Sequence, residues 1–426
     1  MYMSENKKDS LLDRFKKSIG PGVVTGIADD DPSGIATYAQ TGAMFGFAQL
    51  WLALFSFPFM VVVQEMCGRI GMVTGKGLAQ IIRLHYSKKI LFFIVAVLCI
   101  ANIFNIGADL SAMAASAQLV YNAPFYFWLI GLTIVTLVVE VMVPYPTYVK
   151  VLKYFAATVL AYVVSAFVIK QDWSSIAMST IVPHFEFNKA YLLNIIAMLG
   201  TTISPYLFFW QADEEIEEEL ESGKLRFMGR GVPKITKDDV KQMRSDTIVG
   251  MFLSNLITFF VITTSASTLH ANGIFTVTSA SDVAEALRPL AGDYATIIFA
   301  LGIIGTGMLA VPVLAGSAAY AIAESFGWKE GLGKTFPQAK GFYSVIILAT
   351  LIGASFSFTS IDPMIVLYYA AILNGLLAPP LLIIILLIAN NKKILGEYTN
   401  KKITNILGWT ITIIMSVLSV IFFATL

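Results

Sequence analysis

Three consecutive aspartates, Asp29, Asp30 and Asp31, lie in the middle of a segment (20–45) that is otherwise apolar or small and that also contains Pro32. A carboxylate at the centre of a bilayer costs about 2.5–3.5 kcal/mol on insertion scales, so this run needs water, protons, a basic partner or a metal ion to offset it. A basic partner is the weakest candidate, because Lys and Arg occur only near the ends of the predicted spans. Successive helical residues point about 100° apart, so the three side chains cannot all face one point. We take Asp31 as the first candidate ligand and Asp30 as the second. Whether Asp29 or Asp30 instead lines a water path or pairs elsewhere stays open.

A second apolar segment, 190–212, is also interrupted by polar and helix-breaking residues, namely Gly200, Thr201, Thr202, Ser204 and Pro205. Proline removes a backbone donor and clashes with the preceding turn, so both segments should break. A break leaves carbonyl groups unsatisfied at the negative pole of the first half-helix, where a cation is a suitable partner. Thr201 and Ser204 are therefore candidate ligands. The alternative is that their hydroxyls bond to their own backbone or to a neighbouring helix.

The elements that position these residues are membrane helices. Of the 426 residues 57% are hydrophobic and 13% are charged, about half the charged share of a soluble domain. About 20 mostly apolar residues cross a bilayer, which predicts an all-α integral membrane protein with eleven spans: 20–45, 48–68, 89–119, 124–145, 147–169, 190–212, 246–268, 293–323, 341–357, 363–389 and 403–425. The two breaks lie 173 residues apart, which suits an inverted repeat of helices 1–5 and 6–10 with helix 11 added. Paired interrupted helices of this kind indicate a transporter binding site.

The distribution of charge predicts the orientation. With residues 1–19 as a cytoplasmic tail, 26 of the 29 Lys and Arg residues fall on the cytoplasmic side, and only Lys170, Lys189 and Arg288 fall outside. This bias places the N-terminus in the cytoplasm and the C-terminus outside. Short loops favour a multi-pass protein of a prokaryotic cell membrane. Residues 20–426 form one transmembrane domain.

The partners that composition supports are the lipid bilayer and a transported ion. There is no basic face for nucleic acid, and we expect neither a cofactor nor an obligatory protein partner. The largest predicted loop, 213–245, starts acidic and ends basic. Such a charge run is usually a solvated face, although a role as a sensor of cytoplasmic cations is a weaker possibility.

A single carboxylate, Asp109, lies inside the third predicted span. Ionisable groups within a membrane are functional by default, so we expect Asp109 to act in transport. Asn102 and Asn105 lie nearby, and bonding between helices is the favoured role for them.

Taken together these stretches resemble the NRAMP divalent-metal transporters, which have the LeuT-type fold. The matching stretches are GPGVVTGIADDDPSGIATYAQTGA, VVQEMCGRIGMVTGKGLA, GADLSA, LGTTISPY and SDTIVGMFLSNLITFF. The resemblance implies that Asp31 is the metal-binding aspartate and that the carbonyls of Ala28 and Thr201 bind metal. The family's asparagine ligand falls on Gly34 and its methionine ligand on Ser204.

The same comparison bears on proton movement. The family's two helix 6 histidines fall on Tyr206 and Gln211, and Asp109 keeps the helix 3 aspartate. With Asn105 these residues are the candidates for a proton path or for support of the ligands. The acidic residue three positions after Asp109 is replaced by Ala112, and 341–357 lacks arginine. We therefore expect weak or absent proton coupling, although clustered carboxylates bind protons that a metal would displace.

The donors left in the site are all oxygen atoms, which suit Mg²⁺ or Mn²⁺ better than soft metals. Loss of the asparagine and methionine side chains also predicts a roomier site. Secondary transport of such divalent cations by alternating access is the function that these residues favour. The main alternative is a carrier of a small organic cation or amino acid, with Tyr206, Phe208, Phe209 and Trp210 as an aromatic wall. A non-transporting scaffold and an enzyme are weaker alternatives.

Overall fold

The computed structural model describes residues 20–143, 147, 157–358 and 361–424, and these residues are almost entirely helical. Within them the only β-type pairing is an isolated bridge between Phe227 and Arg230. In this described part of the chain, eight helical stretches are long and apolar enough to cross a membrane. They are α4 (Trp51–Thr74), α6 (Lys88–Val120), α7 (Phe125–Met142), α11 with α12 (Lys189–Thr202 and Pro205–Glu221), α13 (Lys237–Thr268), α16 (Ala295–Phe326), α18 (Pro363–Ala389) and α20 (Lys402–Ala424).

The remaining predicted spans also have helical counterparts. The first is split into α2 (Pro21–Asp29) and α3 (Pro32–Phe45), and the ninth is α17 (Lys340–Phe356). The fifth, 147–169, is described at residue 147, which is helical, and from residue 157 onward, as η1 (Ala157–Val159) and α9 (Leu160–Val168). The tail 1–19 lies outside the described residues. The all-α membrane architecture with two interrupted helices is thus confirmed.

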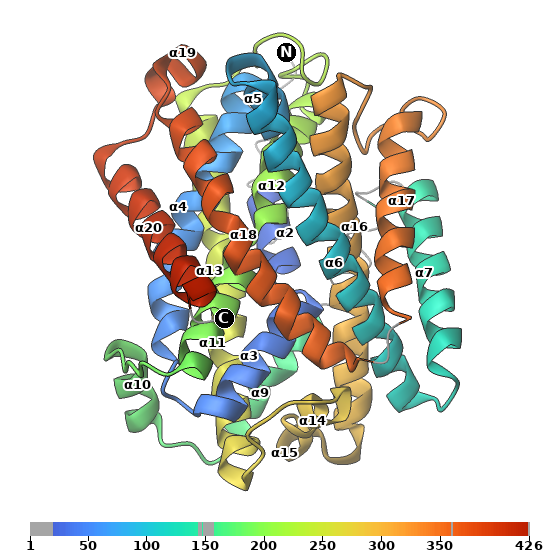
Figure 1. Cartoon of the computed structure of the whole chain (residues 1–426), viewed down its shortest axis with the longest axis vertical. Coiled ribbons are helices and arrows are strands. Elements are labelled where there is room, and N and C mark those ends of the chain that lie inside the picture. The colour runs from blue at the N-terminus through green and yellow to red at the C-terminus, as the bar shows by residue number, and fades with distance from the viewer. Residues whose placement is uncertain (1–19, 144–146, 148–156, 359–360, 425–426) are drawn as a thin grey trace, which may run out of the picture.

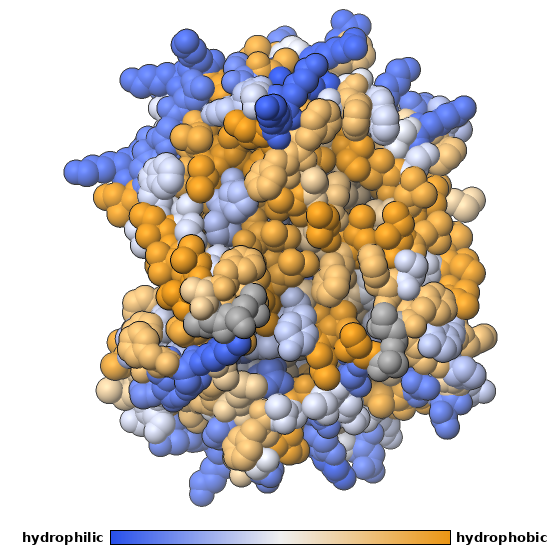
Figure 2. Space-filling model, in the orientation of Figure 1, coloured by the Kyte–Doolittle hydropathy of each residue, from blue (hydrophilic) through white to orange (hydrophobic). Residues whose placement is uncertain are grey.

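Short helices lie at the two ends of the bundle. Those at one end are α5 (Leu78–His85) and α19 (Lys392–Leu395), with η4 (Gly396–Tyr398) following α19; we call this the α5 end. The opposite end holds α10 (Trp173–Ile181), α14 (Ala280–Glu285) and α15 (Arg288–Ala291), as Figure 1 shows, and η2 (His270–Asn272) and η3 (Gly292–Tyr294) belong to the same connections. Between the ends a broad hydrophobic band covers the face shown in Figure 2, and hydrophilic residues gather at both ends. This is the surface of a membrane-embedded bundle.

The predicted loop 213–245 is wrong at both boundaries. Helix α12 continues through Glu221, and α13 already begins at Lys237. The acidic run is therefore helical, and Asp213, Glu215 and Glu219 are buried. The expectation of a solvated face fails here because neighbouring helices cover one side of α12.

Helix α2 is held closely against α13. An ideal Cβ on Gly250 would lie only 2.0 Å from the carbonyl oxygen of Gly22, so the backbones of the two helices touch here. Small residues allow this approach between membrane helices. Asp246 of α13 also accepts hydrogen bonds from the N–H groups of Gly20, Gly22 and Val23 at 3.0, 2.7 and 3.3 Å. One α13 carboxylate therefore caps the N-terminus of α2.

Candidate metal site at two helix breaks

The first break places a carboxylate at a helix start. Helix α2 ends at Asp29, and α3 restarts with Pro32 at its first position. Asp31 is the N-cap residue, and its Oδ1 accepts the N–H of Gly34 at 2.6 Å. Proline at the first helical position has no N–H to lose, so Asp31–Pro32 both ends one half-helix and starts the next.

The second break repeats this arrangement with a hydroxyl in place of the carboxylate. Helix α11 ends at Thr202, and α12 restarts at Pro205 with Ser204 at the N-cap position. The Ser204 hydroxyl lies 2.7 Å from the carbonyl oxygen of Thr201 and 3.1 Å from that of Gly200, and it donates toward both. Carbonyls freed by the break are thus satisfied locally, which is the alternative that the sequence left open for Ser204.

Tyr206 connects the two breaks. Its hydroxyl lies 3.1 Å from the carbonyl oxygen of Ala28 and 3.2 Å from Oδ2 of Asp31, with the proton shared between these two acceptors. Tyr206 is 1% exposed and Asp31 is 2% exposed. Two of the predicted ligand atoms therefore lie side by side, and a side chain from the other broken helix holds them in place.

The two breaks also touch at Gly34. A Cβ placed there would lie 3.2 Å from Oγ1 of Thr201 and 3.3 Å from the carbonyl oxygen of Asp29. The space beside Gly34 is thus closely packed on the Thr201 side, and the expected roomier site stays a prediction. The structure brings together Asp31, Ala28, Gly34, Thr201 and Ser204.

The other two aspartates face α13. Oδ2 of Asp29 accepts the hydroxyl of Ser254 at 2.6 Å, whereas Oδ1 of Asp30 is 3.5 Å from the same hydroxyl. Asp29 therefore pairs away from Asp31. Sequence reasoning missed Ser254, and the only available signal was a hydroxyl within an apolar helix.

The residues proposed for proton movement are divided between different surroundings. Asp109 is fully buried, and neither of its carboxylate oxygens has a hydrogen-bond partner among the described residues. The charge of Asp31 acts on Asp109, and that of Asp109 acts on Tyr206, so Asp109 lies near the first break. Asn105 exchanges amide hydrogen bonds with Asn374 of α18 at 2.8 and 3.2 Å, the role between helices that the sequence favours.

Gln211 is separated from these residues. Its amide nitrogen donates to Glu215 at 2.8 Å, farther along α12 toward the α5 end. Among the described residues no hydrogen bond joins Gln211 to either break, so its hydrogen bonding does not place it beside Asp31.

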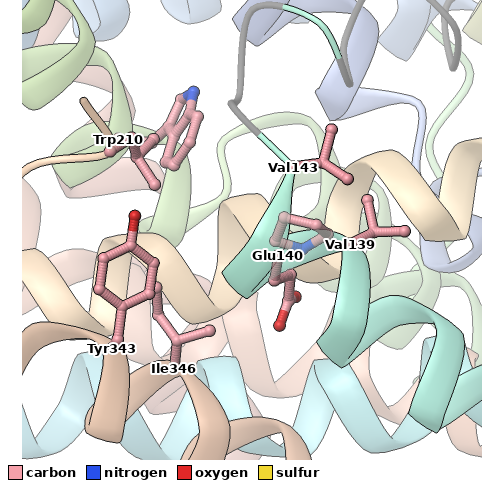
Figure 3. Close-up of a pocket in the computed structure, with 8 residues that line it drawn as sticks. Val139, Glu140, Val143, Trp210, Tyr343 and Ile346 are labelled. Atoms are coloured by element: carbon pink, nitrogen blue, oxygen red, sulfur yellow. The ribbon is translucent and has the colours of Figure 1, made fainter. Parts of the chain in front are cut away.

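Sequence reasoning also missed Glu140 of α7. Its Oε2 accepts the hydroxyl of Thr350 on α17 at 3.4 Å, and its Oε1 has no partner among the described residues. A cavity of about 20 Å³ lies beside it, and Figure 3 shows Glu140 there with Trp210 and Tyr343. The sequence signal for Glu140 was a single acidic residue in the apolar segment 124–145. Its position near the end of that segment suggested a place at the membrane surface.

The proposed aromatic wall does not surround Asp31. Phe208 and Phe209 belong to the hydrophobic core, and Trp210 packs edge-on against Tyr320 with ring centroids 6.5 Å apart. Of the four aromatic residues only Tyr206 contacts the aspartate.

The chemistry of the site is that of oxygen donors. Among the described residues no group of three His, Cys, Asp or Glu side chains is arranged to hold a metal. A cation at the breaks would therefore combine one carboxylate with carbonyl and hydroxyl oxygens, a donor set for hard cations.

Comparison with known proteins shows the family of the chain. The family model described as natural resistance-associated macrophage protein-like (Nramp) matches residues 22–425. The chain belongs to the Nramp family. This confirms the resemblance seen in the sequence, and this Nramp protein is a membrane transporter rather than an enzyme.

Curated relatives and solved structures extend the comparison. The divalent metal cation transporter MntH of Deinococcus radiodurans is 23% identical over 416 residues, which cover 95% of this chain and 89% of the relative. MntH of Klebsiella pneumoniae (strain 342) is 23% identical over 426 residues, covering 96% and 95%. The manganese transporter of Eremococcus coleocola has a similar structure, with a TM-score of 0.74 at 14% identity over 99% of this chain and 88% of that chain.

The fold extends beyond metal carriers. The amino-acid-bound protein MhsT, in complex with L-phenylalanine, has a TM-score of 0.56 at 12% identity, covering 95% of this chain and 97% of that one. These neighbours show the LeuT-type fold, and the cargo of this chain must be argued from its own residues.

Proposed function

We propose that this Nramp protein is a secondary transporter of divalent metal cations that binds its substrate between the two helix breaks. The observation that carries the proposal is the position of Asp31. This buried carboxylate caps α3, and one hydroxyl of α12 joins it to the carbonyl of Ala28. Both halves of the inverted repeat therefore meet at one charged group.

We propose Mg²⁺ or Mn²⁺ as the preferred substrate. Asp31, Ala28, Thr201 and Ser204 offer only oxygen, and Gly34 offers no side chain. Oxygen ligands suit hard and borderline cations, whereas a thioether would favour softer ones. Mn²⁺ is also consistent with the manganese transporter whose fold this chain shares.

We also propose that the α5 end faces the cytoplasm, with the N-terminus inside and the C-terminus outside. The Lys and Arg residues concentrate at this end, as expected for cytoplasmic loops. Alternating access then means that the breaks open in turn to either side. Asp109 remains the candidate proton acceptor beside Asp31, and with Tyr206 and Gln211 in place of histidines we expect weak or absent proton coupling.

The test of the binding site is calorimetric titration of purified protein with Mg²⁺, Mn²⁺, Ca²⁺ and Cd²⁺. The Asp31→Ala variant should lose saturable Mg²⁺ or Mn²⁺ binding at the site. Asp362→Ala is a matched control, because Asp362 also precedes a proline and caps a helix, α18, by accepting the N–H of Met364. Equal binding by the wild type and Asp31→Ala would refute the site. Far tighter Cd²⁺ binding would refute the preference for hard cations, and uptake of small amines in place of metals would favour the organic-cation alternative.

Proton coupling needs a separate measurement. Proteoliposomes with a pH-sensitive dye inside should show metal uptake with little or no acidification of the lumen. Acidification that depends on metal and disappears in Asp109→Asn would show that a proton path survives.

A further inference from the structure

A second set of buried carboxylates lies nearer the α5 end of the bundle. Asp213 of α12 is fully buried, and neither of its carboxylate oxygens has a hydrogen-bond partner in the described part of the chain. Glu324 of α16 is 2% exposed. Its Oε2 accepts the N–H of Gln80 at 3.1 Å, whereas its Oε1 has no partner within the described residues.

These two carboxylates converge at Gly77, the residue that precedes α5. An ideal Cβ on Gly77 would lie 2.3 Å from Oδ1 of Asp213 and 2.3 Å from Oε1 of Glu324. The two oxygens are therefore no more than twice that distance apart, and one cation can reach both at the bond lengths of about 2.0–2.6 Å that Mg²⁺ and Ca²⁺ use. Only glycine at this position leaves room for both carboxylates.

The surroundings are acidic and only partly compensated. Glu330, in the α16–α17 connection, is 7% exposed, and burial followed by the charge of Glu324 raises its pKa to about 9. Lys334 and Arg83 lie near enough to lower that pKa. Neither of them forms an ion pair with Asp213, Glu324 or Glu330 among the described residues.

A neighbouring acid, Glu217, does have hydrogen-bond donors, unlike Asp213. Glu217, one turn along α12, accepts the hydroxyl of Tyr320 at 2.8 Å and the N–H of Leu332 at 2.8 Å. The fold thus provides donors for Glu217 and none for Asp213. Leaving a charged group buried without partners is costly, and one cation beside Asp213 and the unpartnered Oε1 of Glu324 would offset that cost for both.

We propose that Asp213 and Glu324 form a second site for a hard divalent cation, separate from the site at the helix breaks. Its two charges match the two carboxylates. Because no three His, Cys, Asp or Glu side chains are arranged to hold a metal in the described residues, water completes the coordination, as is common for Mg²⁺.

A cation held here connects three elements. Asp213 belongs to α12, Glu324 to α16, and Gly77 to the connection between α4 and α5. Its binding holds these three elements together at the α5 end. If that end is cytoplasmic, a consequence that rests on the proposed function, ions delivered to the cytoplasm slow further uptake.

The test separates the two sites by starting from Asp31→Ala. Free Mn²⁺ is counted by electron paramagnetic resonance during titration of purified protein with Mn²⁺ alone, and Mg²⁺ is then added as a competitor. Asp31→Ala should still bind one Mn²⁺, and adding Asp213→Asn should weaken that binding at least tenfold. Adding Glu218→Gln is the matched control, since Glu218 is an exposed acid of the same helix, and it should change nothing.

Gly77→Ala is the variant that keeps both carboxylates. The backbone at Gly77 has φ −71° and ψ 173°, which alanine adopts freely, so only its Cβ disturbs the site. Added to Asp31→Ala, Gly77→Ala should weaken Mn²⁺ binding as Asp213→Asn does. Mg²⁺ should raise the Tm of Asp31→Ala by binding at the second site, and this rise should be lost when Gly77→Ala is added. Retention of Mn²⁺ by Asp31→Ala/Asp213→Asn, or the absence of any Mn²⁺ in Asp31→Ala, would overturn this second site. Either result leaves the Asp31 test standing on its own.

Discussion

The contact between Asp246 and the start of α2 gives a quantitative prediction about opening at the α5 end. Three N–H groups of residues 20–23 point at this one carboxylate. Losing a helix cap costs about 0.5–2 kcal/mol, and losing a negative charge at a helix N-terminus costs a further 0.3–1 kcal/mol. Asp246→Ala should therefore favour undocking of α2 by about 1–3 kcal/mol, which is about 5- to 150-fold in the equilibrium.

Hydrogen exchange followed by mass spectrometry measures this change directly. Amides of α2 should exchange faster by about this factor, because exchange reports local opening, while amides of α3 stay protected. Asp238→Ala is the control, since Asp238 is exposed in the first turn of the same helix α13. Unchanged exchange in α2, or an equal acceleration across the whole bundle, would refute the idea that Asp246 holds the start of α2 locally.

Three further substitutions test other contacts. Gly250→Ala should lower Tm, because the new Cβ would lie 2.0 Å from a backbone oxygen of α2 and overpacking typically costs about 1–3 kcal/mol. Gly131→Ala on α7 is the control in the same thermal scan. A Cβ on Gly131 would have nothing within 4 Å, so Tm should be unchanged. Tyr206→Phe should weaken Mn²⁺ binding about tenfold in calorimetry, because groups that orient ligands typically contribute 10- to 100-fold, and tighter binding would show that its hydroxyl competes with the metal. Ser204→Met should raise competition by Cd²⁺ against Mn²⁺ uptake, since a thioether favours soft metals; Ser204→Leu supplies similar bulk without sulfur, and an equal effect of both would contradict the role of the donor atom.

The interrupted helices could be predicted because their signals are local. Pro32 and Pro205 each start a half-helix, and the residue before each proline lies at the N-cap position, although only Asp31 accepts a hydrogen bond there. A proline inside an apolar run has one structural consequence wherever it occurs. The same logic identified Asp31 as the residue facing the break.

Contacts between distant segments could not be predicted. The bond between Ser254 and Asp29 joins residues 225 positions apart. Likewise, the convergence of Asp213 and Glu324 depends on a glycine in a third segment. The acidic start of residues 213–245 indicated a loop because charge usually means solvent, and only packing against α4, α5 and α16 reverses that inference.

The donors at the two breaks explain why charge and size, rather than softness, should govern selectivity. The Ala28 and Thr201 carbonyl oxygens accept hydrogen bonds from the hydroxyls of Tyr206 and Ser204, respectively. A cation must displace these hydrogen bonds, each with a net value of about 0.5–1.5 kcal/mol. The hydroxyl oxygens can then turn their lone pairs toward the ion, so each displaced donor becomes a ligand of the same hard type. An ion that is weakly attracted to oxygen cannot offset the free energy of the lost hydrogen bonds. A small divalent cation beside Asp31 can, because each hydroxyl oxygen that turns toward it adds a favourable contact. We therefore expect the site to favour cations of high charge density, because a soft metal finds no sulfur or nitrogen among these residues to compensate for its weaker attraction to oxygen.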